Sequence, residues 1–203
     1  MPLEITEESA ASLASYAQVP IAFEVRTVLD VVDSDHGLGG LTLTPRMLDV
    51  PYVKDYDADP AHHPLRWAER FDLSTWGFLA ARVDGERVGG AAIAFGGTGM
   101  DMFEGRRDLA VLWDLRVTPA MRGKGIGAAL FKAAEEWARL HGTRWLKVET
   151  QNINAGACRF YARQGCTLGG IHRFAYPELP HEAQLLWYKE LGIRERPMAS
   201  RPR

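Results

Sequence analysis

The sequence contains few cysteines, no long apolar run and no excess of basic residues. Two cysteines, Cys158 and Cys166, among 203 residues exclude a framework of several disulfides, and no His pairing stands beside them at metal-ligand spacing. No apolar run approaches the roughly 20 residues that span a bilayer, and residues 1–8 are acidic where a secretory signal is basic and then apolar. We therefore expect a cytoplasmic protein with no metal site and no membrane contact.

The balance of charges argues against a nucleic-acid partner. Lys and Arg number 24 against 26 Asp and Glu, a formal net charge of -2, whereas nucleic-acid-binding domains carry a basic excess. Hydrophobic residues make up 46% of the chain and charged residues 25%, the mixture of a globular protein that buries a core. At this length we expect one domain.

Apolar patterns along the chain predict a mixed α/β domain around a single sheet. A helix-start signal at Thr6 predicts a helix over 6–17, and residues 49–64, bounded by prolines, are predicted to form an irregular loop. The expected strands cover 21–32, 41–44, 76–83, 87–95, 109–117, 144–150, 167–174 and 183–191, and the expected helices 65–72, 126–140 and 155–164. We therefore expect an N-terminal helical segment over 1–20, the domain over 21–192 and a frayed tail over 193–203.

A glycine-rich loop at 122–127 (RGKGIG) lies between the predicted strand 109–117 and the clearest helix. The apolar residues of that helix repeat at a 4-3-4-3 spacing from Ile126 to Leu140. Glycines let backbone amides approach a ligand without a Cβ in the way, and a helix N-terminus favours an anion. Arg122 and Lys124 add positive charge. The loop is therefore predicted to bind a pyrophosphate.

Other interpretations of this loop fit less well. A P-loop requires Ser or Thr after its lysine, but Lys124 is followed by Gly125. The dinucleotide pattern GxGxx(G/A) matches Gly123, Gly125 and Ala128, with Glu149 downstream, but its first glycine belongs tightly after the strand. The remaining alternative is a helix with an incidental glycine-rich start.

The loop also resembles the coenzyme A-binding motif (Q/R)xxGx(G/A) of the GCN5-related N-acetyltransferases (GNAT). Asn154 at the start of the next predicted helix and Tyr161 before Gly165 follow in that family's order. Other segments are similar to those of streptothricin acetyltransferases, and the resemblance covers nearly the whole chain, from Phe23 to Leu191. These segments are 50–56 (VPYVKDY), 149–154 (ETQNIN), 157–161 (ACRFY) and 186–189 (LWYK).

This resemblance implies a fold, a co-substrate and a set of binding residues. The fold is a single-domain GNAT fold with a mixed, mostly antiparallel central sheet flanked by helices. The co-substrate is acetyl-CoA. We expect no metal, and the protein is expected to be a monomer or a homodimer. The pantetheine arm of acetyl-CoA would lie along the strand 112–117, and its pyrophosphate on the glycine-rich loop. The implied cofactor-binding residues are Leu115, Arg116, Val117, Arg122, Gly123, Lys124, Gly125, Ile126, Gly127, Ala128, Asn154 and Tyr161.

Three residues are candidates for proton transfer. The resemblance makes Tyr161 the general acid, because a phenol stays protonated at neutral pH and can donate to the departing thiolate; the alternative is a core aromatic. Asp114 and Glu149, on the two strands expected to flank the cofactor, are candidates for the base. Strand alternation places Asp114 with Leu112 and Arg116. Either carboxylate could instead be a solvated strand residue or a partner of Arg116.

An excess of acidic residues over 30–59 points to a cationic acceptor. This stretch would attract a polycationic amine near Tyr52, Asp55 and Tyr56, although polar loops of this kind are common. We therefore predict an N-acetyltransferase that acts on a primary amine of a small cationic molecule, with the β-lysine amine of streptothricin as the leading candidate. The alternatives are a protein lysine or N-terminal acetyltransferase and a non-catalytic acetyl-CoA-binding module.

Overall fold

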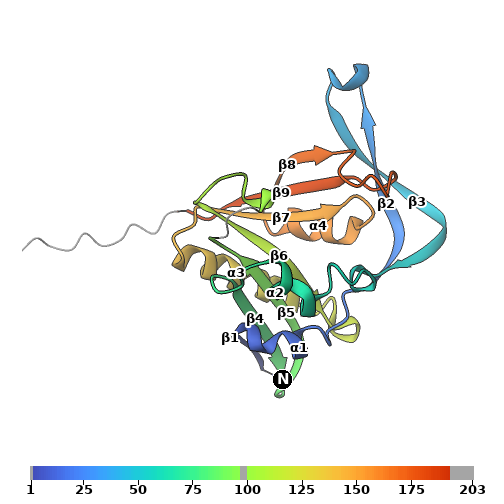
Figure 1. Cartoon of the computed structure of the whole chain (residues 1–203). Helices are drawn as coiled ribbons and strands as arrows, with labels where there is room; N and C mark the ends of the chain where they lie inside the picture. Colours follow the sequence, from blue (N-terminus) through green and yellow to red (C-terminus); the bar gives the residue numbers. More distant parts are fainter. Residues whose placement is uncertain (1, 97–99, 193–203) are drawn as a thin grey trace, which may run out of the picture.

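Seven strands of the described chain form one sheet in the order β1-β4-β5-β6-β7-β9-β8 (Figure 1). The computed structural model describes residues 2–96 and 100–192. Neighbouring strands pair antiparallel, except β6 and β7, which pair parallel. The strands are β1 (Leu3–Glu8), β4 (Gly77–Val83), β5 (Glu86–Ala94), β6 (Leu109–Val117), β7 (Trp145–Gln151), β8 (Thr167–His172) and β9 (Gln184–Glu190).

A long two-stranded ribbon stands apart from this sheet. It consists of β2 (Phe23–Asp33) and β3 (Leu41–Lys54), and Figure 1 shows it, in blue and cyan, projecting beyond β8 and β9. The α-helices in the described ranges are α1 (Leu13–Tyr16), α2 (Trp67–Arg70), α3 (Ile126–Leu140) and α4 (Ala155–Arg163). No helix within these ranges is long and apolar enough to cross a membrane.

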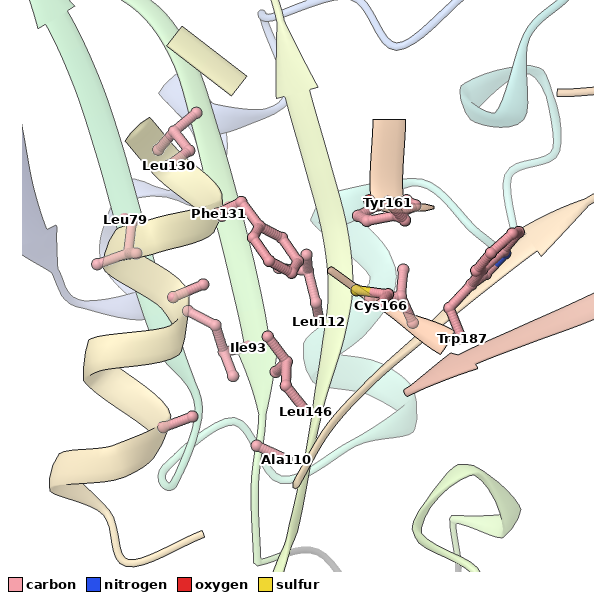
Figure 2. Close-up of a cluster of buried hydrophobic side chains, with 14 of the residues drawn as sticks. Leu79, Ile93, Ala110, Leu112, Leu130, Phe131, Leu146, Tyr161, Cys166 and Trp187 are labelled. Carbon is pink, nitrogen blue, oxygen red and sulfur yellow. The ribbon is translucent and has the colours of Figure 1, made fainter. Parts of the chain in front are cut away.

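The sheet separates two hydrophobic clusters. On one face α3 and α4 cover the larger cluster, in which Leu130 and Phe131 meet Leu112 and Leu146 of the strands (Figure 2). On the other face, aromatic residues of α1, α2 and β4 form the smaller cluster with Val111 of β6. Adjacent residues of β6 thus point into different clusters, as a strand buried on both faces requires. This mixed, mostly antiparallel sheet flanked by helices confirms the predicted fold class.

The structure corrects the prediction at the N-terminus. The helix expected over 6–17 is wrong: residues 3–8 form β1, and α-helix is confined to Leu13–Tyr16. Acidic residues after Thr6 favour a helix start locally, but pairing with β4 satisfies the backbone of this segment. Residues 3–8 therefore belong to the main sheet instead of a helical segment over 1–20.

The structure also corrects the loop predicted over 49–64. Strand β3 runs to Lys54 and carries Pro45 and Pro51 within it. A ribbon of two strands leaves each strand one unpaired edge, where a residue without an N–H is tolerated. The helix predicted over 65–72 is present in shorter form as α2. The frayed tail predicted over 193–203 lies outside the described residues.

Candidate active site

Strands β6 and β7 pair over part of their lengths and then separate. The parallel ladder ends where Leu112 meets Val148. Beyond this point β6 continues to Val117 paired with β5 alone, while β7 pairs with β9. In the described part of the chain, the backbone of residues 113–117 thus has no strand on its β7 side. Its N–H and C=O groups can pair there with an extended ligand.

A β-bulge in β6 places one extra residue at the point of separation. Ile93 and Ala92 are adjacent in β5, but their partners in β6 are Leu112 and Asp114, so Trp113 is the additional residue. A bulge bends its strand and interrupts the alternation of side chains between the two faces.

This bulge overturns the expected grouping of Asp114 with Leu112. Leu112 and Leu115 both pack into the larger cluster, whereas Asp114 accepts a hydrogen bond from Tyr16, a member of the smaller cluster. The expectation assumed that side chains alternate strictly between the two faces along β6. The extra residue at Trp113 shifts this alternation for the residues that follow it.

The side chain of Arg116 is buried in an ion-pair cluster that includes Asp114. Its Nε and Nη2 donate to the two carboxylate oxygens of Asp114 at 2.9 and 2.6 Å. Its Nη1 donates to Asp57 at 2.8 Å and to the Val19 carbonyl at 3.1 Å, and Tyr16 donates to Asp114 at 2.5 Å. Burial opposes the charge, but the attraction of Asp114 outweighs it and raises the pKa of Arg116. The interpretation of Asp114 as a partner of Arg116 therefore fits better than the role of base.

The glycine-rich loop leads into the N-terminus of α3, and the backbone amides of residues 123–128 have no acceptor in the described part of the chain. Gly123 and Gly125 have φ of +77° and +84°, the left-handed region that favours glycine. The first intrahelical bond runs from Ala129 N to Gly125 O, so the preceding amides of α3 have no acceptor within the helix. These outward N–H groups and the helix dipole are the features that the predicted pyrophosphate site requires.

The two cations of the loop differ in their surroundings. The guanidinium of Arg122 donates to the carbonyls of Val117, Ala22 and Pro20 at 2.9, 2.9 and 3.2 Å. Arg122, expected to contact a pyrophosphate, is therefore engaged in tying the loop to β6 and to the segment before β2. Lys124 is exposed, with its Nζ 3.5 Å from the Met121 sulfur, and keeps its charge available to an anion.

Tyr161 lies on α4 at the end of the larger cluster, beside the separated part of β6. Its ring is 5.8 Å from that of Phe131, and Figure 2 shows it near Cys166 and Leu112. Burial, followed by the negative charge of Asp114, raises the pKa of its phenol. Within residues 2–96 and 100–192 no protein group hydrogen-bonds its hydroxyl. Tyr161 is therefore a core aromatic residue whose hydroxyl has no protein hydrogen-bond partner among the described residues.

Glu149 lies at the other side of the opening, in a network of neutral donors. Tyr176 donates to its Oε1 at 2.5 Å, and Gln184 donates to its Oε2 at 2.8 Å. The amide of Gln151 donates to Tyr176 at 3.0 Å and in turn accepts a hydrogen bond from Tyr56. Unlike Asp114, Glu149 forms no ion pair within the described residues. Its carboxylate therefore has neutral hydrogen-bond donors at both oxygens.

The other residues singled out from the sequence take several roles. Asn154 caps α4, because its Oδ1 accepts from Ala157 N at 3.0 Å. Tyr56 is largely buried and joins the Glu149 network, whereas Tyr52 is 44% exposed on β3. Asp55 is exposed and caps the short 3-10 helix Tyr56–Ala58. The structure thus brings Tyr56 to Glu149 and leaves Tyr52 and Asp55 at the surface.

Three functional candidates escaped the sequence analysis: Tyr16, Tyr176 and Gln184. Each contacts Asp114 or Glu149 from a segment distant in sequence, and no local motif marks it. Among the described residues, no group of three or more His, Cys, Asp or Glu side chains could hold a metal ion. A separate cavity of about 440 Å³, lined by Glu104 and Trp145 among others, contains none of the predicted site residues.

Comparison with known proteins identifies the family. A model of the acetyltransferase (GNAT) family matches residues 45–166. The chain belongs to this family. Streptothricin acetyltransferase of Escherichia coli is 33% identical to this GNAT chain over 176 residues, which cover 85% of the chain and 88% of that protein. The chain is therefore an acetyl-CoA-dependent N-acetyltransferase, as its motifs predicted.

Solved structures support the same fold. Nourseothricin acetyltransferase superposes with a TM-score of 0.74 at 23% identity, over 95% of this chain and all of that one (100%). A Bacillus anthracis protein solved in complex with acetyl coenzyme A gives a TM-score of 0.73 at 22% identity, over 93% of this chain and 99% of the other.

Proposed function

We propose that this GNAT chain transfers the acetyl group of acetyl-CoA directly to a primary amine of a small cationic acceptor. The β-lysine amine of streptothricin is the leading candidate. One observation carries the proposal: the opening between β6 and β7 has a phenol, Tyr161, on one side and, on the other, the carboxylate of Glu149, which forms no ion pair with the described residues. The similarity to the Escherichia coli streptothricin acetyltransferase supports the choice of acceptor.

The residues present fit the co-substrate. Backbone groups of Leu115, Arg116 and Val117 that face away from β5 would pair with the pantetheine arm, because β6 has no partner strand on that side among the described residues. The unpaired amides of 123–128 and the exposed Lys124 would hold the pyrophosphate, while Arg122 fixes the shape of the loop. Bound acetyl-CoA supplies an acyl thioester.

The proton transfers are then assigned to two side chains. A primary ammonium must lose a proton before it can attack, and Glu149 accepts it. The departing thiolate must gain a proton, and the buried phenol of Tyr161 gives it; its raised pKa keeps it protonated. Asp114 stays in its ion pair with Arg116 and takes no part in either transfer.

Negative charge around the opening favours a cationic acceptor. Glu149 carries no counter-cation in the described chain, and Asp57 and Asp114 share the single charge of Arg116. The amine of the acceptor would be attracted by this net negative charge and oriented by Tyr56 at the edge of the network.

The test is a direct assay of product. Purified protein is incubated with acetyl-CoA and streptothricin, and mass spectrometry follows the antibiotic while free thiol is measured. We expect the monoacetylated antibiotic with matching release of coenzyme A, and almost none with Tyr161→Phe. If acetyl-CoA binds but streptothricin is not acetylated, the proposed acceptor is wrong. Lysine-like amines and basic peptides then replace it in the same assay.

A further inference from the structure

We propose that Tyr176 is a positioning residue for the acetyl transfer: its hydroxyl holds the carboxylate of Glu149 in the orientation that accepts the proton of the acceptor amine. The inference rests on the proposed function, since it assigns Glu149 as base. It adds the loop between β8 and β9, residues 173–183, to the acceptor side of the site.

The hydrogen bonds around Tyr176 run in one direction. Tyr56 donates to the side-chain oxygen of Gln151, which leaves the amide nitrogen of Gln151 facing Tyr176. That nitrogen donates to the Tyr176 oxygen at 3.0 Å, so the proton of Tyr176 points to Glu149 Oε1 at 2.5 Å. The order Tyr56, Gln151, Tyr176, Glu149 satisfies every donor in turn.

The carboxylate is held at both oxygens without being neutralised. Gln184 donates to Oε2 at 2.8 Å, while Oε1 accepts from Tyr176 at 2.5 Å and, more weakly, from the Gln151 amide at 3.5 Å. The two short contacts fix the rotation of the carboxylate plane and leave an acceptor site free, because an ionised carboxylate has about four. Burial, and then the charge of Glu149, raise the pKa of Tyr176, so it remains a donor at neutral pH.

The ring of Tyr176 has no comparable role in packing. Within the described ranges Tyr176 belongs to neither of the two main hydrophobic clusters and makes no aromatic ring contact. Its specific interactions are those of its hydroxyl, with Glu149 and Gln151. The specific contacts of Tyr176 thus come from its hydroxyl and not from its ring.

The loop that carries Tyr176 is anchored on two sides. Glu182 pairs with Lys54 of β3 at 2.6 Å, and both side chains are largely buried. Ala183 N donates to the side chain of Asn152 at 2.7 Å, and that side chain also donates to the Leu29 carbonyl at 3.1 Å. The loop is thereby fixed to the ribbon and to the end of β7, so Tyr176 is presented to Glu149 by a held backbone.

A double-mutant cycle tests the inference. The variants are Tyr176→Phe, Glu149→Gln and the double variant, assayed for acceptor turnover with separate titration of acetyl-CoA. We expect kcat to fall about tenfold in Tyr176→Phe and about a hundredfold in Glu149→Gln. The double variant should be no slower than Glu149→Gln, because Tyr176 acts through that carboxylate. The KM for acetyl-CoA should change less than twofold.

Tyr188→Phe is the matched control. Its hydroxyl also donates to a carboxylate, Glu104, which lines the separate cavity. This variant should keep wild-type kcat. Losses that multiply in the double variant would refute the positioning role while leaving the proposed function intact.

A measurement without turnover separates the two proposals. Carbon-13 NMR of labelled protein identifies the Glu149 carboxyl signal by its loss in Glu149→Gln. We expect that signal to shift in Tyr176→Phe and to stay in place in Tyr188→Phe. A signal unmoved by Tyr176→Phe overturns the inference even if the wild-type protein acetylates amines. A shifted signal in a protein that acetylates no amine supports the contact and refutes the proposed function.

Discussion

Replacing Arg116 with methionine should destabilise the protein more than any surface ion-pair change. The guanidinium is 1% exposed and serves two carboxylates, Asp114 at 8% exposure and Asp57 at 16%. Methionine fills much of the space but leaves Asp57 and the Val19 carbonyl without the guanidinium donor, and leaves Asp114 with the Tyr16 hydroxyl as its remaining donor. Removing one partner of a buried ion pair costs about 3–5 kcal/mol.

The assay is urea unfolding combined with calorimetry. For a protein of this size 1 kcal/mol corresponds to roughly 2–4 °C, so the cost translates to a fall in Tm of about 6–20 °C. The control is Arg26→Met, because Arg26 pairs with Glu24 at the surface, with side chains 64% and 45% exposed. We expect that change to stay within about 0.5 kcal/mol.

Two outcomes bear on the reasoning. A loss below about 1 kcal/mol for Arg116→Met, similar to that of the control, would show that the cluster is solvated in solution. Partial recovery of stability when Asp57→Asn is added to Arg116→Met would support the ion-pair interpretation, because it removes one of the two carboxylate charges that lose their counter-cation. If Arg116→Met does not fold, Arg116→Lys retains a charge but loses the bidentate fork and should show a smaller loss.

Three further predictions concern the loop, the phenol and the N-terminal strand. Gly125→Ala should lower the free energy of unfolding by about 1–2 kcal/mol, because φ is +84° there, and should also weaken acetyl-CoA binding measured by calorimetry. The control is Gly142→Ala, at φ +77° after α3, which should lower the free energy of unfolding by a similar amount without affecting binding. Tyr161→Phe should lower kcat by a factor of about 10²–10⁴. It should change the free energy of unfolding by less than about 0.5 kcal/mol, because no described protein group hydrogen-bonds the Tyr161 hydroxyl; a large loss of stability would contradict this. At Glu8, burial raises the pKa, but Arg82 and Arg87 outweigh it, so the pKa is lowered in the folded state. The contribution of Glu8 to stability is therefore present above its unfolded-state pKa and disappears as the pH falls through its folded-state pKa. Glu8→Gln should therefore be less stable than wild type at pH 7 in thermal melts, and the difference should shrink as the pH falls below the unfolded pKa of Glu8; a difference in Tm that does not shrink in acid would refute the linkage.

Local signals in the sequence were sufficient for the loop and most of the sheet. The strand predicted over 109–117 is β6 residue for residue, and the helix after the glycine-rich loop is α3. Both depend on short-range physics, namely apolar periodicity and glycines at positive φ. The end of α3 shows the limit, because Leu140 continues the apolar spacing but is 67% exposed.

Long-range contacts decided what the local signals could not. The segment 3–8 became a strand because β4 offered it a partner, although its acidic residues favour a helix start. Asp114 and Glu149 looked equivalent as strand carboxylates. Arg116 and Tyr16 donate hydrogen bonds to Asp114, whereas the neutral donors Tyr176 and Gln184 hold Glu149.

By itself, the sequence determined the family, the order of helices and strands from α2 onward and the glycine-rich loop before α3, because each depends on residues close together in the chain. The tertiary structure alone decided where β6 leaves β7, that a bulge at Trp113 turns Asp114 toward Arg116, and that Arg122 braces the loop. It also decided that Glu149 keeps a carboxylate without a counter-cation among the described residues. The physical reason is that pairing register and charge partners depend on groups brought together from distant parts of the chain, and no periodicity along one segment records them.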